Sequence, residues 1–243
     1  MSTKETTKLI QTEVGVNPDG IWGPNSANAV AKALGIGKVD DDVLLWYPNA
    51  RTDFNASVTR GTYAHNYPQG AIVHFTCGWW NRSLDDQVAE QVENRYTYFV
   101  IDENGRIAQN FPLNEWGYHA GKSYMAPFGS SVSQYLVGIE ICCAGKLEKD
   151  ETPEFTNITF PEKDKRRSDG EANIKKGVYQ KYTAAQEAAL ETLLLWLHEN
   201  NPNVFKLDYV FGHDEVSPDR KSDPGASLSM TMPEFRAKLK GLV

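Results

Sequence analysis

The chain has 243 residues, of which 40% are hydrophobic, and its formal net charge is −7 at pH 7. The hydrophobic fraction supports a folded core and excludes a chain that is disordered throughout. The negative charge argues against a general binder of nucleic acid or membrane surfaces, since both attract a basic face. No apolar run approaches the roughly 20 residues that span a bilayer, and the start, MSTKETTKLIQ, lacks the apolar segment of a signal peptide. We therefore expect synthesis in the cytoplasm without membrane insertion.

Two short helices around a turn-rich loop are predicted at the N-terminus. Apolar residues recur at helical spacing in residues 3–13 and 26–34, on either side of NPDGIWGPN. In this order, GVNPDGIWGPNSANAV resembles the repeat of the peptidoglycan-binding domains of bacterial and phage wall enzymes. The resemblance implies that residues 1–42 are a helical wall-binding module with its linker, and that residues 43–243 are a second domain. A helical hairpin that merely packs on that domain is the alternative.

Strands and a helix alternate through the first part of the second domain. β-branched and aromatic residues bounded by Gly and Pro predict strands at VLLWYP and at residues 70–76. Ser83, with Asp86 three residues later, predicts a helix that runs to about residue 94. The segment YTYFVIDENGRIAQNFP predicts a hairpin that turns at DENG, and YLVGIEICCAG predicts a nearly continuous apolar strand.

A polar stretch, residues 146–181, separates this part from the C-terminal elements. We interpret it as a long surface insertion in which the charge run KDKRR is a solvated face. Capping boxes at Thr183 and Thr231 predict two helices, the second of which ends near Leu239. The segment YVFGH between them predicts a short strand.

The stretch FGHDEVSPDRKSDPG, residues 211–225, carries an imidazole, a cation and a carboxylate to one place. Its two prolines and two glycines predict an irregular loop with neither a helix nor a long strand. Loops held by a rigid scaffold are where binding and catalytic groups concentrate. A surface turn whose polar residues face water is the alternative.

Histidines at two strand ends and an aspartate form the ligand set of a catalytic zinc site with an open fourth position. The candidates are His74, His213 and Asp223. A buried, hydrogen-bonded histidine is the alternative for His74. Amide hydrolysis at such a site needs a base for the water proton and a cation for the oxyanion, and Glu140 and Lys221 have the right chemistry. Glu140 interrupts an apolar run, where a carboxylate is costly unless it is paired or bound.

Three segments, IVHFT, VGIEI and GHDEVSPDRKSDPG, resemble the zinc-dependent N-acetylmuramoyl-L-alanine amidases over residues 44–240. That family includes phage lysozymes of amidase type, bacterial wall amidases and animal peptidoglycan recognition proteins. The resemblance implies an α/β fold in which helices flank a mixed central β-sheet. It also implies one Zn²⁺ ion and cleavage of the amide between N-acetylmuramic acid and L-alanine of peptidoglycan.

Carried over by position, the resemblance gives each candidate residue a role. Some relatives use a tyrosine where this chain has Thr97, so Glu140 is expected to carry the base function. The implied roles are zinc ligation by His74, His213 and Asp223, general base catalysis by Glu140, oxyanion stabilisation by Lys221, and substrate contact by His119 and Trp116.

The expected enzyme is a monomeric wall hydrolase that binds neither nucleic acid nor membrane. A phage endolysin released through a partner pore such as a holin, or a lytic enzyme exported by a secretion system, fits the wall-binding-like module. Either would act on the cell wall after release. The alternatives are a cytosolic muropeptide-recycling amidase, a non-catalytic peptidoglycan recognition protein, and a zinc peptidase acting on the stem peptide.

Overall fold

The structure is a computed structural model that describes residues 3–22, 24–34, 43–52, 58–77, 83–148, 151–153 and 158–243. Its helices are α1 (Thr3–Glu13), α2 (Pro24–Ala33), α3 (Leu84–Asn94), α4 (Ala184–Asn200), α5 (His213–Val216) and α6 (Met232–Lys240). Its strands are β1 (Ala50–Arg51), β2 (Gly61–Thr62), β3 (Gly70–Phe75), β4 (Tyr98–Ile101), β5 (Ile107–Ala108), β6 (Glu115–Trp116), β7 (Leu136–Ile141), β8 (Lys165–Ser168), β9 (Gly177–Gln180) and β10 (Val210–Gly212).

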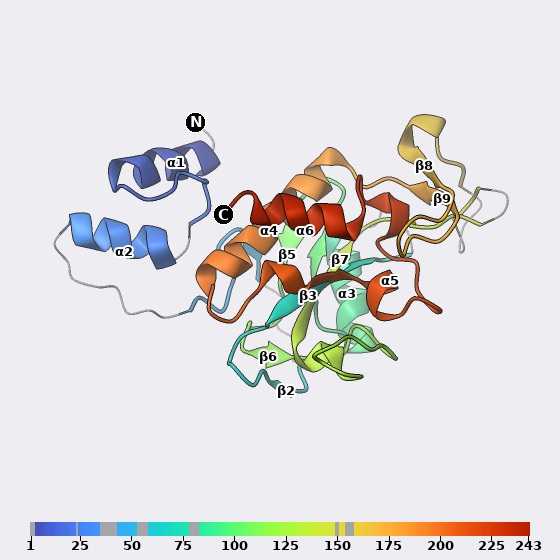
Figure 1. The fold of residues 1–243 in the computed structure, drawn as a ribbon, viewed down its shortest axis with the longest axis horizontal. Helices are drawn as coiled ribbons and strands as arrows, with labels where there is room; N and C mark the ends of the chain where they lie inside the picture. The colour runs from blue at the N-terminus through green and yellow to red at the C-terminus, as the bar shows by residue number, and fades with distance from the viewer. Residues whose placement is uncertain are drawn as a thin grey trace.

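A mixed sheet in the order β1-β5-β4-β7-β3-β10 forms the centre of the molecule, as expected (Figure 1). The strands β4, β7, β3 and β10 run parallel, so their carboxyl ends meet at one edge of the sheet. The predicted hairpin is confirmed, because β4 pairs antiparallel with β5 and the Gly105 N–H closes the turn on the Asp102 carbonyl at 2.9 Å.

The predicted strand at VLLWYP is wrong. Residues 43–48 form no strand, and the sheet edge is the two-residue β1 that follows them. The Asn200 side chain at the end of α4 bonds both the N–H and the carbonyl of Leu44, at 3.0 and 2.8 Å. These apolar residues therefore cover the end of a helix, which a strand-like composition does not distinguish from sheet pairing.

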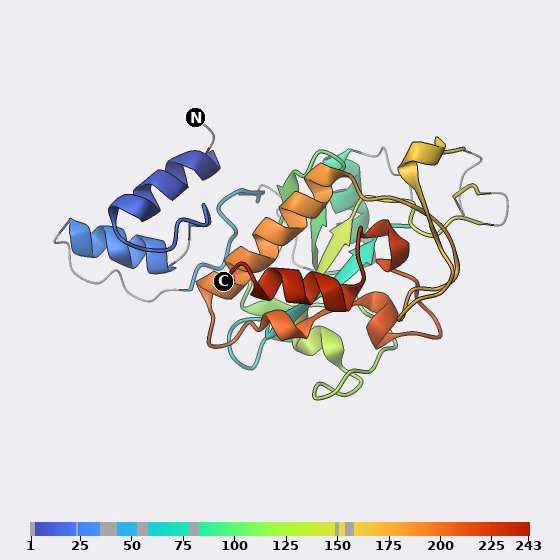
Figure 2. The ribbon, with the colours of Figure 1, turned by 45° about the horizontal axis from the view of Figure 1, so that its top comes forward.

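Helices lie on both faces of the central sheet (Figures 1 and 2), and the side chains that alternate along its strands pack into a different cluster on each face. One face packs against the leucines of α4 and against α6. The opposite face packs against α3 and against the segment of residues 120–136. On β3, Ala71 and Val73 belong to the first face and Ile72 to the second. Because successive side chains of a strand point to opposite faces of the sheet, His74 lies on the second face, away from α4.

The N-terminal helices contact the end of α4. The Trp196 indole N–H donates to the Trp22 carbonyl at 3.0 Å, and Ile21 is buried in the same core cluster as Trp196. The Gln11 side chain holds the intervening loop, since it donates to the Ile21 carbonyl and accepts from the Gly20 N–H, each at 2.8 Å. The predicted linker falls largely in residues 35–42, which lie outside the described residues.

A carboxyl group near the end of α4 faces this module, and it makes the contact sensitive to pH. Glu199 lies 3.4 Å from the Ser26 hydroxyl, and its other oxygen is buried without a hydrogen-bond partner among the described residues. Burial, followed by the nearby Asp19 carboxylate, raises the pKa of Glu199 to about 7. The folded chain therefore keeps a proton that the unfolded chain has already lost between pH 4.5 and 7.

We expect the wild-type chain to lose stability as the pH rises through this window, because the buried carboxylate must then be charged. Glu199→Gln removes the titration, so the variant unfolds at a higher temperature than wild type above pH 7 and at a similar temperature near pH 4.5. Thermal unfolding across this range measures the difference, with the exposed Glu171→Gln as control. An equal pH dependence for wild type and Glu199→Gln would contradict the buried position of this carboxyl.

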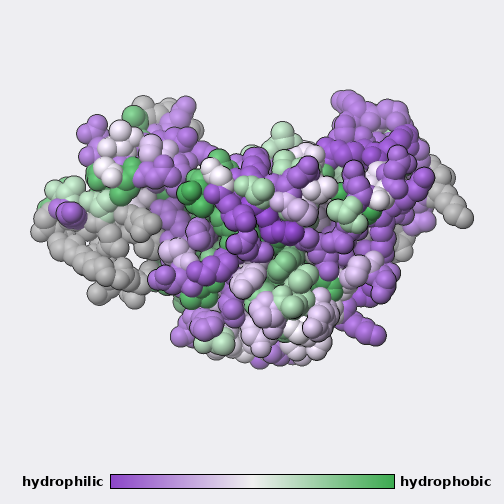
Figure 3. All heavy atoms as spheres, viewed as in Figure 1, coloured by the Kyte–Doolittle hydropathy of each residue, from purple (hydrophilic) through white to green (hydrophobic). Residues whose placement is uncertain are grey.

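Hydrophilic side chains dominate the face in Figure 3, and the hydrophobic ones lie in separate patches. Within the described ranges, no helix combines the length and the apolar character that crossing a bilayer requires.

Candidate active site

Adjacent strands bring two of the predicted residues together. His74 on β3 and Glu140 on β7 are register partners near the carboxyl ends of parallel strands, on the face opposite α4. The strand β10 leads directly into His213, the first residue of α5. The loop 211–225, predicted to lack a helix, thus contains one helical turn, which orients His213 back over the strand ends.

Three buried side chains converge on one point at this edge of the sheet. The His213 Nδ1 atom lies 2.8 Å from His74 Nδ1 and 2.8 Å from Asp223 Oδ2, and His74 Nδ1 lies 3.1 Å from the same oxygen. Their exposed fractions are only 1 to 3%. Within the described residues, this is the one group of three such side chains whose ligand atoms lie close enough to hold a metal ion. Two imidazoles and a carboxylate match the donor set of a catalytic zinc site.

The other ring nitrogens fix both histidines in the form that binds a metal. The His213 Nε2–H donates to the Ala120 carbonyl at 2.9 Å, so in the neutral imidazole Nδ1 carries no proton and has a lone pair for a metal ion. The His119 Nε2–H donates to the Leu136 carbonyl at 2.9 Å, so its Nδ1 accepts from His74 Nε2 at 3.0 Å. The His74 Nδ1 is therefore also a lone pair, directed at the convergence point.

His119 is a positioning residue in this arrangement. It lies at the cleft, and both its ring nitrogens are engaged inside the protein. Its contact with substrate stays a prediction. Gly138 on β7 makes room for the ring, because a Cβ atom there would approach His119 Cγ to 2.8 Å. The glycine of the VGIEI segment is thus needed for close approach, a requirement that sequence reasoning missed.

Glu140 has the burial expected of a tuned acid–base group. Its Oε2 atom is buried and has no hydrogen-bond partner among the described residues. Burial, then the charge of Asp223, raise the pKa of Glu140 to about 8, and Lys221 opposes that rise. An unpartnered carboxylate oxygen beside three converging ligands fits a site that takes a cation and a water molecule.

The two titrating ligands are held in the right charge states. Burial, then the adjacent His213, lower the pKa of His74 to about 4, so this imidazole is neutral at neutral pH. Burial acts to raise the pKa of Asp223, but the two adjacent imidazoles, His213 and His74, outweigh it and lower the pKa well below its ordinary value. Neutral imidazoles and an ionised carboxylate are the metal-binding forms.

A cleft of about 260 Å³ opens above the cluster. Lys221 and Arg220 line one side, from the loop that carries Asp223. Arg220 was missed by sequence reasoning, although it adjoins Lys221. Its Nη2 donates to the carbonyls of Ala120 and Lys122, each at 2.8 Å, and so ties the metal loop to the segment bearing His119.

Trp116, the other predicted substrate contact, is not among the cleft-lining residues. It lies on β6, where it pairs with Gly61 of β2 and meets the Tyr118 ring at a centroid distance of 5.7 Å. Thr97 is buried and donates to the Val58 carbonyl at 3.2 Å, so its hydroxyl serves the fold.

The insertion 146–181 makes hydrogen bonds to the chain that follows Asp223, so it is not merely a surface feature. Its strands β8 and β9 form an antiparallel hairpin. Arg166 Nη1 donates to the carbonyls of Ala226 at 3.0 Å, Ser227 at 3.3 Å and Leu228. The interpretation of KDKRR as a solvated face is therefore wrong for Arg166, which satisfies three backbone carbonyls just after Asp223.

We expect Arg166→Ala to weaken metal binding, because the chain that follows Asp223 loses a charged partner for three carbonyls. The expected loss in zinc affinity is roughly 10- to 100-fold, the usual effect of removing support behind a ligand. Competition with a zinc chelator measures it. Arg167→Ala is the matched control, since the neighbouring Arg167 pairs with half-buried Glu151 and exposed Glu162 instead. Equal zinc affinities for Arg166→Ala and Arg167→Ala would show that the hydrogen bonds of Arg166 do not support the metal site.

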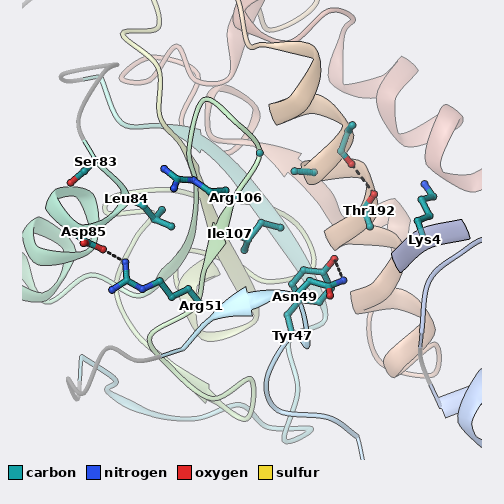
Figure 4. Close-up of a pocket in the computed structure, with 13 residues that line it drawn as sticks. Lys4, Tyr47, Asn49, Arg51, Ser83, Leu84, Asp85, Arg106, Ile107 and Thr192 are labelled. Carbon is teal, nitrogen blue, oxygen red and sulfur yellow. Dashed lines mark hydrogen bonds and ion pairs between the residues drawn. The ribbon is translucent and has the colours of Figure 1, made fainter. Parts of the chain in front are cut away.

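A larger cavity, of about 590 Å³, lies at the far edge of the sheet (Figure 4). One side is bordered by Lys4 of α1, by Thr192 of α4, and by Tyr47, which precedes β1. Arg51 and Asp85 form an ion pair on the other side. Among the described residues that line it there is no histidine, cysteine or glutamate, which are the residue types that carry the chemistry of the smaller cleft.

Several solved structures have a fold similar to that of this chain. The chain is similar to AmpDh3 from Pseudomonas aeruginosa in complex with anhydromuramic pentapeptide, with 18% identity over 82% of this chain and 67% of that chain and a TM-score of 0.50. It is also similar to a mutant endolysin from Bacillus subtilis, with 20% identity over 79% of this chain and 98% of that chain and a TM-score of 0.49. Its similarity to the catalytic domain of XlyA has 24% identity over 79% of this chain and 99% of that chain, with a TM-score of 0.48. No curated protein sequence matches the chain significantly.

The family profile described as N-acetylmuramoyl-L-alanine amidase (Amidase_2) matches residues 64–226. This range contains the three converging ligands, Glu140 and Lys221, and it covers more than half of the chain. The chain therefore belongs to the N-acetylmuramoyl-L-alanine amidase family.

Proposed function

We propose that this amidase hydrolyses the bond between N-acetylmuramic acid and L-alanine with one zinc ion held by His74, His213 and Asp223. The observation that carries the proposal is the convergence of their three ligand atoms beside the unpartnered Glu140 oxygen. When bound there, zinc would make a water molecule more acidic and polarise the scissile carbonyl.

The protein's own groups then have distinct tasks. Glu140 accepts the proton of the attacking water and returns it to the amine of L-alanine as the amide bond breaks. Burial raises the pKa of Glu140 to about 8 in the metal-free chain, and the charge of a bound zinc ion would lower it, so that the group can accept and return a proton near neutral pH. The Lys221 ammonium, at the cleft, stabilises the negative charge that develops on the carbonyl oxygen. His119, through His74 Nε2, keeps the ligand nitrogen free of a proton.

The proposed biological role is lysis of the cell wall, by a phage endolysin or an exported enzyme that acts after release. The wall-binding-like sequence of residues 1–42 supports this role. Its helices contact the end of α4, so they do not line the cleft. A muropeptide-recycling amidase would have no use for such a module and would prefer small soluble anhydromuropeptides.

Metal reconstitution tests the cofactor, and a substrate comparison tests the role. The chelated protein should lose hydrolysis and regain it with about one equivalent of Zn²⁺ per chain, whereas Mg²⁺ should not restore it, because imidazole ligands favour zinc. Full activity in the chelated protein would exclude the zinc proposal. Faster turnover of soluble anhydromuropeptides than of purified sacculi would favour recycling over lysis.

A further inference from the structure

The strand that leads into the ligand His213 lies at the edge of the central sheet. Among the described strands, β10 is the last in the sheet order and pairs with β3 alone. The backbone groups of Val210 and Gly212 that point away from β3 therefore have no neighbouring strand to bond. Both residues are buried, so these groups need partners within the protein. His213 follows directly, so the position of β10 sets where its imidazole lies.

A guanidinium and a carboxylate take the place of the missing strand. The Arg236 Nη1 atom, from α6, donates to the Val210 carbonyl at 2.9 Å. The Glu215 Oε2 atom, from α5, accepts the Gly212 N–H at 2.9 Å. The two side chains also bond each other, from Nη1 to Oε2 at 2.6 Å and from Nη2 to Oε1 at 2.8 Å. One donor and one acceptor thus meet the free edge of β10, as a neighbouring strand would.

The geometry and the burial of this ion pair make it a rigid support. The side chains of Arg236 and Glu215 are only 16% and 8% exposed. The guanidinium also lies 5.6 Å from the centroid of the Phe211 ring, which belongs to the same strand. Two-point pairs between a guanidinium and a carboxylate are stronger and more directional than single contacts, and burial protects them from screening by salt.

The ion pair is separate from the contacts that attach α6 to the rest of the protein. The apolar side chains of Phe235 and Leu239 are buried in the core, and Lys238 pairs with Glu191 of α4. Arg236 lies outside the cleft lining, and it follows residue 226, where the match to the family profile ends. Its bonds lead instead to the residues that directly precede a metal ligand.

We propose that Arg236, through Glu215, is a positioning residue that sets the place of His213 in the three-ligand cluster. The pair holds the end of β10 so that the His213 Nδ1 atom meets His74 and Asp223, each at 2.8 Å. This inference rests on the proposed function for the bound metal. It extends the support of the metal site to α6, a helix that the family profile does not match.

Zinc affinity of the full-length chain, measured by competition with a chelator, tests this role. Arg236→Ala should bind zinc roughly 10- to 100-fold more weakly than wild type, the usual effect of removing support behind a ligand. Arg236→Lys should fall between them, because one ammonium cannot reproduce the two-point pair. Lys238→Ala is the matched control, since Lys238 lies on the same helix and pairs with Glu191 instead. Its zinc affinity should equal that of wild type.

A double-mutant cycle separates positioning from a general loss of stability. In a His213→Ala chain, Arg236→Ala should cause no further loss of zinc affinity, because its effect passes through the missing ligand. Breaking a buried ion pair can prevent folding, so a second variant combines Glu215→Gln with Arg236→Met. It removes both charges at similar volume and leaves the Val210 carbonyl without its donor, so zinc affinity should again fall.

The outcomes distinguish this role from the proposed function. Equal zinc affinities for wild type, Arg236→Ala and the double variant would overturn the positioning role and leave the zinc site intact. A full further loss in the His213→Ala chain would also overturn it, because Arg236 would then act on the fold as a whole. Absence of zinc binding by wild type would contradict the proposed function, and the role of Arg236 with it.

Discussion

Asp223→Ala is expected to remove zinc and activity together. The substitution leaves two imidazoles, and it deletes the oxygen that lies 2.8 Å from His213 Nδ1 and 3.1 Å from His74 Nδ1. A two-ligand site holds metal poorly, so zinc should bind at least about 100-fold more weakly, and hydrolysis should fall to background. Metal analysis after dialysis, paired with an assay on sacculi, measures both effects.

The control for this variant lies in the same loop. Asp219 is exposed, so Asp219→Ala removes a carboxylate of equal charge without touching the cluster. It should keep one zinc per chain and wild-type activity. Retention of stoichiometric zinc by Asp223→Ala would show that the third ligand is a different residue.

Glu140→Gln should separate metal binding from chemistry. Glutamine has nearly the same shape as glutamate, and Glu140 is not one of the three residues whose ligand atoms converge, so zinc should stay bound. Loss of the general base should lower kcat roughly 10²- to 10⁴-fold with a small change in KM. Rates on a soluble muropeptide, measured with a zinc assay on the same sample, give both values.

The same variant bears on the pH profile. Because burial raises the pKa of Glu140 to about 8 in the metal-free chain, the wild-type rate should fall as acid protonates this carboxylate. Bound zinc adds positive charge nearby, so the fall should occur below pH 8. The residual rate of Glu140→Gln should not show this fall at acid pH. A near-wild-type rate in this variant would assign proton transfer to a different group.

The elements that carry the site could be predicted because each has a strong local signal. The apolar strand that ends at His74, the carboxylate inside VGIEI and the turn-rich loop with Asp223 are visible as patterns. Parallel strands place their carboxyl ends at one edge of the sheet, and this accounts for the neighbouring positions of His74 and Glu140.

Other parts of the site depend on contacts between distant segments, which local patterns do not encode. Gly138 is indistinguishable from any strand glycine until the His119 ring is seen above it. Arg166 lies in a charge run within a polar insertion, and only the folded chain shows that it reaches the carbonyls after Asp223. The failed strand at VLLWYP has a similar cause, because Asn200, about 155 positions away, takes its backbone groups.

The most direct measurement is mass spectrometry of the products released from purified sacculi, with and without a zinc chelator. The expected products are stem peptides with a free L-alanine amino terminus and intact glycan strands, and the chelator should abolish their release. Cleavage within the stem peptide, release that ignores the chelator, or binding to sacculi without any release would contradict it.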